Sequence, residues 1–153
     1  MAELEQIRQM EGSWQAKTSL QVMPGEPVRD SHSRLRVKPA IKDKFVQINY
    51  DWEDEGQPQE GLLLVGYDKA RELATAVWWD SWHMGEQYMS FQGSIDESGS
   101  IFLRGTYPAP TGPDWGWRIV LRPDGDTLKL RMYNSTPDGQ ELWAVKADYS
   151  RAD

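Results

Sequence analysis

The chain of 153 residues contains no cysteine, only two histidines and only three phenylalanines. The absence of cysteine excludes a disulfide framework, an iron–sulfur cluster and a thiol nucleophile. No apolar run approaches the roughly 20 residues that a membrane-spanning helix needs. The first residues, MAELEQIRQMEG, lack the apolar core of an export signal. We therefore expect a cytoplasmic protein with no membrane partner.

Positive charge is also scarce, because 17 Lys and Arg face 24 Asp and Glu and the net charge is −7. Nucleic-acid affinity depends mostly on contacts between cations and phosphates, so no nucleic-acid partner is expected. One basic stretch, residues 29–44, departs from this composition and is interpreted as the solvated face of a strand. The length predicts a single domain over residues 1–153, large enough to fold without a covalent staple.

Turn signals recur along the whole chain at nearly even spacing. Nine of them, from MPGEP near residue 24 to TPDGQ near residue 137, separate ten segments rich in β-branched and aromatic residues. Such segments are typical of strands. Only residues 2–10, AELEQIRQM, favour a helix, with Leu4 and Ile7 on one side.

The side chains within these segments alternate with a period of two, which predicts half-buried strands. In SWQAKTSLQV one face carries Trp14, Ala16, Thr18, Leu20 and Val22. KFVQINYDWE, DWGWRIVLR and DTLKLRMYN repeat the pattern. GLLLVGY, residues 61–67, is apolar on both faces, so we expect both of its faces to be covered.

Ten strands joined by short turns favour antiparallel pairing between neighbours in sequence. An open sheet of ten strands would expose two edges, and closure removes both. The sequence therefore predicts an all-β fold, a closed up-and-down antiparallel β-barrel of about ten strands with a short N-terminal helix over one end. An immunoglobulin-like sandwich is the alternative, although it prefers shorter spacing and long crossover connections.

Two sets of residues resemble known proteins. Gly12 to Trp14, in MEGSW, match the glycine–any residue–tryptophan signature of calycin (lipocalin-like) barrels. MPGEP, EGLLLVGYDKA, VWWDSW and SFQGSIDESG, in this order, resemble an uncharacterised bacterial family of lipocalin-like domains of unknown function, over nearly the whole chain. The matching positions are Gly12, Trp14, Gly66, Tyr67, Asp68, Trp79, Asp80, Ser81 and Gly93. The resemblance implies a calycin-type barrel and no activity.

The calycin resemblance also implies a role for the first tryptophan. In such barrels it plugs one end, beneath a basic side chain from near the last strand. Arg151, in ELWAVKADYSR, is the candidate partner for Trp14 through a cation–π contact. Both residues are therefore expected to be structural, and so is Asp68, at a turn where Asp can bond local backbone N–H groups.

The segment TAVWWDSWHMGEQY, residues 75–88, concentrates unusual residues. We expect Trp79 to face the lumen together with Val77, and Trp78 and Trp82 to face the opposite side. Large exposed apolar patches are rare on monomers. Those two tryptophans would need a cover, either the N-terminal helix or a second subunit, so a homodimer is predicted.

The aromatic composition, with eight Trp and six Tyr, favours a binding function. We expect a hydrophobic or aromatic small molecule in the barrel lumen, bound without any chemistry. The predicted ligand-binding residues are Tyr50, Trp52, Trp79, Asp80, His83, Tyr88, Trp117 and Met132. The alternative, that these rings simply fill the barrel, is equally open at this point.

Other functions are less well supported by the residues. An enzyme at the barrel mouth could use Asp80 and His83 as acid and base, but Asp80 and Ser81 point to opposite faces of a strand and no GxSxG elbow is present. Haem bound through His83 is possible, whereas His32 is expected to face solvent. Asp80, His83 and Glu86 have helical rather than strand spacing, so no metal is predicted. A carbohydrate- or partner-binding barrel is a further alternative.

Overall fold

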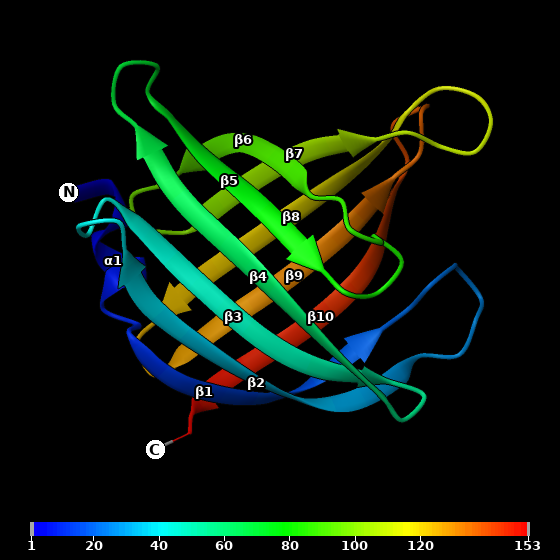
Figure 1. Ribbon diagram of the computed structural model, residues 1–153, viewed down its shortest axis with the longest axis horizontal. Coiled ribbons are helices and arrows are strands. Elements are labelled where there is room, and N and C mark those ends of the chain that lie inside the picture. Colours follow the sequence, from blue (N-terminus) through cyan, green and yellow to red (C-terminus); the bar gives the residue numbers. More distant parts are fainter. Residues whose placement is uncertain (1, 153) are drawn as a thin grey trace.

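The computed structural model describes residues 2–152, which form ten strands preceded by a short helical segment (Figure 1). The helical segment consists of η1 (Ala2–Leu4) and α1 (Glu5–Arg8). The strands are β1 (Gly12–Leu20), β2 (Arg29–Ala40), β3 (Phe45–Asp54), β4 (Gln57–Asp68), β5 (Leu73–Asp80), β6 (Met89–Ile95), β7 (Ile101–Tyr107), β8 (Trp115–Asp124), β9 (Thr127–Ser135) and β10 (Glu141–Arg151).

Each strand pairs antiparallel with the next strand in sequence, and β1 pairs with β10. The sheet is therefore a closed up-and-down barrel, which confirms the predicted fold and excludes the sandwich. Closure places Trp14 opposite Arg151 on one side and opposite Leu35 on the other. Because the ring is closed, every strand of residues 2–152 has a hydrogen-bonded neighbour on both sides.

The alternation predicted from the sequence is visible in the burial of the strands. In β1 the inward residues Trp14, Ala16, Thr18 and Leu20 are all buried. In β2 inward and outward residues alternate in the same way, and His32 lies on the exposed outer side. The basic stretch is thus the solvated face of a strand, as expected.

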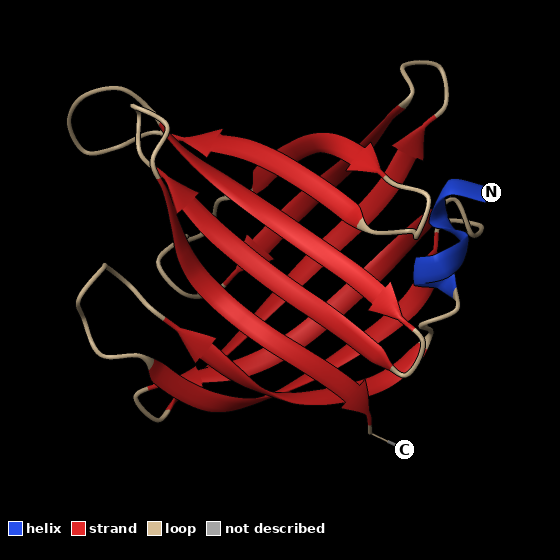
Figure 2. Cartoon of the chain, turned by 180° about the vertical axis from the view of Figure 1, so that it is seen from behind, coloured by secondary structure: helices blue, strands red, loops and turns tan. Residues whose placement is uncertain are grey.

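The N-terminal helical segment covers one end of the barrel (Figure 2). Leu4 and Ile7 are almost fully buried, and Met10, just after the helix, is 5% exposed. These side chains join the core cluster that fills this end. Within residues 2–152, neither helical piece has the length or the apolar character of a membrane span.

Trp14 and Arg151 close the same end, and their predicted contact is confirmed. The Trp14 ring is fully buried and its Nε1 donates a hydrogen bond to the Met10 carbonyl at 2.7 Å. The guanidinium carbon of Arg151 lies 4.3 Å from the centre of the Trp14 ring. The same guanidinium donates to the carbonyls of Glu11 at 2.6 Å and Gln9 at 3.0 Å. Arg151 thus ties the helix, the first strand and the last strand together.

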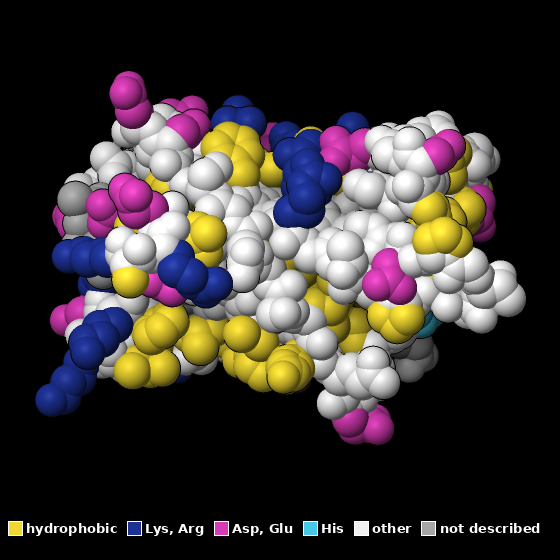
Figure 3. Space-filling view, turned by 90° about the horizontal axis from the view of Figure 1, so that it is seen from above, with side chains coloured by type: hydrophobic (Ala, Val, Ile, Leu, Met, Phe, Trp, Pro, Cys, Tyr) yellow, Lys and Arg dark blue, Asp and Glu magenta, His cyan; other side chains and the backbone are white. Residues whose placement is uncertain are grey.

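The expectation that GLLLVGY is covered on both faces is wrong. Leu63 and Val65 are buried inside, whereas Leu62 and Leu64 point outward and are only half-buried. On the outer surface they lie opposite Trp79 and Val77 of β5, and this row of apolar side chains shields itself in part. Apolar groups lie between charged ones over the outer surface (Figure 3).

Replacing Trp14 with alanine should cost about 3–5 kcal/mol of unfolding free energy, because it removes a fully buried ring and leaves a cavity at the plugged end. Trp79→Ala is the matched control, since Trp79 is 39% exposed on the outer surface. Its cost should stay within about 1 kcal/mol. Urea denaturation of both variants measures the difference, and equal costs would contradict the role of Trp14 as the plug.

Candidate functional site

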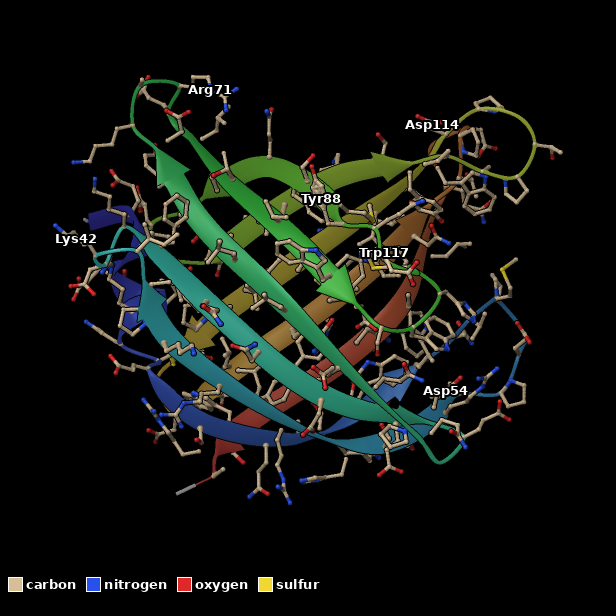
Figure 4. The ribbon with its side chains drawn as sticks, in the orientation of Figure 1. Lys42, Asp54, Arg71, Tyr88, Asp114 and Trp117 are labelled. Carbon is tan, nitrogen blue, oxygen red and sulfur yellow. The ribbon has the colours of Figure 1, made fainter. Side chains whose placement is uncertain are left out.

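The end of the barrel opposite the helix opens into a cavity of about 470 Å³. Its walls combine inward side chains of the strands with residues of the loops at this end. Figure 4 shows Trp117 within the barrel, Asp54 and Asp114 toward the open end, and Lys42 and Arg71 toward the other end. The inner lining includes Thr18, Ser33, Tyr50, Trp78, Trp117, Leu130, Met132 and Tyr149, and the mouth includes Met23, Arg29, Trp52, Trp82, His83, Tyr88 and Pro108.

Two pairs of tryptophans form much of the aromatic wall of this cavity. Trp78 stacks on Trp117 with ring centres 5.7 Å apart and an angle of 13° between the planes. Trp52 meets Trp82 edge to face, with centres 5.6 Å apart. Offset-stacked and edge-to-face pairs at these separations are the favourable arrangements of aromatic rings. The indole nitrogen of Trp117 is buried and has no hydrogen-bond partner among the described residues.

Asp80, the last residue of β5, is the acidic group of the cavity wall and is only 8% exposed. Its Oδ2 accepts a hydrogen bond from the Tyr50 hydroxyl at 2.5 Å and one from Trp52 Nε1 at 3.3 Å. Its Oδ1 accepts from the backbone N–H of Trp82 at 2.9 Å. The Tyr50 hydroxyl in turn accepts from Trp78 Nε1 at 2.8 Å. The carboxyl therefore holds three aromatic residues and the start of the next loop in place.

The strand register explains how Tyr50 reaches Asp80. Gly61 of β4 lies directly between them, paired with Tyr50 on β3 and with Asp80 on β5. A Cβ atom on Gly61 would lie 2.2 Å from Cζ and Oη of Tyr50. Because glycine has no side chain, the tyrosine ring crosses the intervening strand and brings its hydroxyl to the carboxyl.

Burial sets the protonation behaviour of this pair. Burial raises the pKa of Asp80 above its ordinary value, and the hydrogen bonds from Tyr50, Trp82 and Trp52 oppose that rise. Burial, together with the charge of Asp80, raises the pKa of Tyr50 well above its ordinary value. Tyr50 therefore remains a hydrogen-bond donor to Asp80 at every physiological pH.

A second carboxyl, Asp54, stabilises the rim of the cavity. Its Oδ2 accepts from Trp82 Nε1 at 3.0 Å, and its Oδ1 lies 2.6 Å from a guanidinium nitrogen of Arg29. Arg29 also reaches Glu55 at 3.4 Å. His83 stacks on the Trp82 ring with centres 3.8 Å apart. Arg29 of β2 thus pairs with Asp54 of β3, and the indole of Trp82 fixes the loop after β5 to that same carboxyl.

Seven of the eight predicted ligand-binding residues line the cavity, and the eighth does not. Those in the lining are Tyr50, Trp52, Asp80, His83, Tyr88, Trp117 and Met132. Trp79 points outward, where it stacks on Tyr88 with ring centres 5.9 Å apart. The predicted facing of β5 is therefore reversed, because Trp78 and Trp82 lie on the cavity side and Val77 accompanies Trp79 on the outer side.

The reversal has a physical reason in the polar atoms of the segment. VWW is apolar on both faces, so periodicity alone does not choose between them. Trp78 finds a partner for its indole N–H inside, on Tyr50, and Asp80 two residues later shares that side. The homodimer was predicted from Trp78 and Trp82, and it loses that basis because both rings lie on the cavity side.

The enzyme alternative required Asp80 and His83 to work together. Among the described residues, the hydrogen bonds that Asp80 accepts come from Tyr50, Trp52 and the Trp82 backbone, and His83 stacks on the Trp82 ring. The Ser81 hydroxyl bonds a neighbouring strand, donating to Gln59 at 2.7 Å and accepting from the Glu60 backbone. Across residues 2–152, no three His, Asp or Glu side chains gather as a set of metal ligands.

Sequence reasoning missed several parts of the site. It did not connect Asp80 to Tyr50, which lies 30 residues earlier in the chain, and it overlooked the buried pair Tyr149 and Ser33, whose oxygens are 2.7 Å apart. Burial raises the pKa of Tyr149 to about 12. A signal for the first contact exists, since Gly61 stands directly before the apolar run of β4 and lies opposite Tyr50.

These features define a class, a closed ten-stranded barrel plugged at one end and hollow at the other. The chain belongs to the family described as "Protein of unknown function (DUF1579)", whose model matches residues 1–151. Among solved structures it is similar to the "Crystal Structure of Rv2717c from M. tuberculosis", with a TM-score of 0.67 and 13% sequence identity, over 100% of this chain and 99% of the other. That likeness is one of fold. No curated protein sequence matches the chain.

Tyr50→Phe should raise the pKa of Asp80 further, because the hydrogen bond from Tyr50 favours the charged carboxylate. The variant also leaves Trp78 Nε1 without its acceptor, so the unfolding free energy should fall by about 1–3 kcal/mol. Carboxyl-carbon NMR titration of Asp80 measures the pKa. Tyr107→Phe, which removes a different cavity hydroxyl bonded to Asn134, should leave that titration unchanged, and a lower pKa in Tyr50→Phe would contradict the assignment.

Gly61→Ala should displace the Tyr50 ring from Asp80 and destabilise the fold by about 1–3 kcal/mol through overpacking. Gly66→Ala on the same strand is the control, since its Cβ would meet the ring of Phe45 at 2.5 Å on the outer side, where the ring can swing into solvent. The readouts are urea denaturation and the NMR titration of Asp80. A larger effect in Gly66→Ala than in Gly61→Ala would overturn the explanation.

Proposed function

We propose that this protein binds a hydrophobic or aromatic small molecule in the barrel lumen and does not transform it. The observation that supports the proposal is the cavity of about 470 Å³ at the open end. Its size is within the range of small-molecule sites, and its mostly apolar walls with a few fixed polar groups are typical of such sites.

The aromatic residues of the wall favour a flat ligand. Trp117, Trp78, Trp52 and Trp82 line the cavity in two interacting pairs. Hydrogen bonds to Tyr50, Asp80 and Asp54 hold Trp78, Trp52 and Trp82 in place, and Trp117 stacks on Trp78. A site whose side chains are already held loses little conformational freedom on binding. The wall therefore offers an ordered apolar surface before any ligand arrives.

We further infer that the barrel is of the calycin type. The support is the glycine–any residue–tryptophan signature at Gly12 to Trp14 together with the stacking of Arg151 on Trp14. Lumen binding is consistent with this architecture, since a barrel plugged at one end and open at the other has a single entrance.

Thr18→Phe tests where a ligand binds. Thr18 lines the cavity and is 7% exposed, so a phenyl group at this position would occupy the lumen. The fluorescent probe 1-aminoanthracene should bind the unaltered protein and bind Thr18→Phe at least about tenfold more weakly. Fluorescence titration measures both affinities.

Lys17→Phe provides the matched control, because Lys17 is the neighbouring residue with its side chain 73% exposed on the outer surface. Its affinity for the probe should stay within about twofold of the unaltered protein, since successive strand residues face opposite sides. Equal weakening by both variants, or no binding of the probe at all, would contradict lumen binding.

Native mass spectrometry and an absorption spectrum of protein purified from its own cells identify the class of ligand. A retained apolar compound of matching mass supports the proposal. A Soret band would assign haem instead and make His83, the histidine of the cavity lining, its candidate axial ligand.

A further inference from the structure

Two carboxyl groups near the open end have similar hydrogen-bond partners but different charge environments. Asp54 accepts from the indole of Trp82 and is paired with Arg29 at 2.6 Å. Asp80 accepts from the indole of Trp52 and the hydroxyl of Tyr50, yet no Lys, Arg or His lies within salt-bridge distance of it among the described residues. The carboxyl at the rim is neutralised and the carboxyl of the cavity wall is not.

A buried carboxylate without a cation is costly, because its lost hydration is only partly replaced by neutral donors. Burial accordingly raises the pKa of Asp80. The three donors to Asp80 also leave part of its acceptor capacity free, since a carboxylate has about four acceptor positions and Asp80 uses three. One free acceptor position lies on Oδ1, which binds only the Trp82 N–H.

The surroundings of Asp80 are aromatic. Tyr50, Trp52, Trp78, Trp82 and Trp117 line the same cavity, and aromatic faces attract organic cations, most strongly when the cation is desolvated. Arg29, the arginine of the lining, is occupied by Asp54 and Glu55. The cavity wall therefore offers negative potential and ring faces, with no free guanidinium for an anion.

We infer that the lumen selects ligands that carry a protonated amine on an aromatic or apolar body, with the ammonium group placed against Asp80. The inference rests on the proposed binding function and specifies its ligand class. The net charge of −7 also favours cationic ligands, because it raises the concentration of cations near the entrance. A carboxylate ligand such as a fatty acid meets repulsion from Asp80.

Three naphthalene probes of similar size test the inference, which share the ring and carry substituents of different charge. They are 1-naphthalenemethanamine, protonated at pH 7, the neutral 1-naphthalenemethanol, and the anion 1-naphthoate. Isothermal titration of the unaltered protein should give an affinity for the amine at least about tenfold above that for the alcohol, which is the gain expected of a charge-assisted hydrogen bond over a neutral one. The anion should bind weakest.

Asp80→Asn should reduce the preference for the amine over the alcohol to within about twofold, because the ratio of the two affinities reports the charge at position 80 even where both affinities change. Glu60→Gln is the control, since it removes one negative charge from the exposed outer side of β4 beside Gly61, and it should keep the full preference. Measurable binding of the alcohol by Asp80→Asn shows that the variant still has a lumen that binds the probes.

The outcomes separate the two proposals. Binding of 1-aminoanthracene and of the alcohol without a preference for the amine, or with tighter binding of 1-naphthoate, overturns the selection of amines and leaves lumen binding standing. No binding of any of the four compounds overturns both. Because the ranking of the probes uses the unaltered protein, the inference is tested even where Asp80→Asn fails to fold.

Discussion

The pairing of β1 with β10 is the constraint on which the rest of this molecule depends. It converts a row of ten antiparallel strands into a ring without edges, and it places Arg151 opposite Trp14. The end plug therefore follows from closure, because the last residue of the final strand reaches the first buried ring of the first strand. Arg151 also donates hydrogen bonds to the carbonyls of Glu11 and Gln9, and these bonds orient the helical segment over the opening. One interaction thus closes the wall and one end of the barrel together.

Closure also explains why the other end is hollow. A ring of this strand number encloses more space than side chains from its walls readily fill, and only one end has a helix to supply apolar groups such as Leu4 and Ile7. At the other end large aromatic rings contact each other and form the wall of the cavity, so the interior there is not filled by a packed core. Rings such as Trp78 and Trp52 have polar N–H groups that need acceptors when buried, and Tyr50 and Asp80 supply them. The polar network around Tyr50 and Asp80 therefore follows from the tryptophans of the wall, because their buried N–H groups need acceptors.

The sequence predicts the fold almost completely, because turn signals and alternation are local properties of the chain. The strand that contains Trp14 to Leu20 shows its inward face directly, since the outward positions are polar. The same reasoning fails at Trp78 and Trp79, where both faces are apolar and the correct choice depends on Tyr50, a residue on another strand. The sequence therefore predicts most of the residues that line the cavity, but it does not predict which of them form hydrogen bonds with one another. Outside β5, periodicity predicts which residues line the lumen, whereas the contact between Asp80 and Tyr50 depends on the register of three strands around Gly61.

Trp82 links the two carboxyls of the open end, and this has a consequence for entry into the lumen. Its indole N–H donates to Asp54 and its backbone N–H donates to Asp80, so the first turn of the loop after β5 is fixed at two points. Outward motion of this turn breaks both hydrogen bonds at once, and both acceptors are ionisable groups, for which a lost donor is more costly than for neutral acceptors. The following residues His83 and Gly85 have positive φ angles of 63° and 58°, which confines the turn to a narrow set of conformations. The rim beside Trp82 is therefore the stiff part of the entrance. At Met23 and Pro108, which also line the cavity, no comparable pair of charge-assisted hydrogen bonds holds the loops among the described residues.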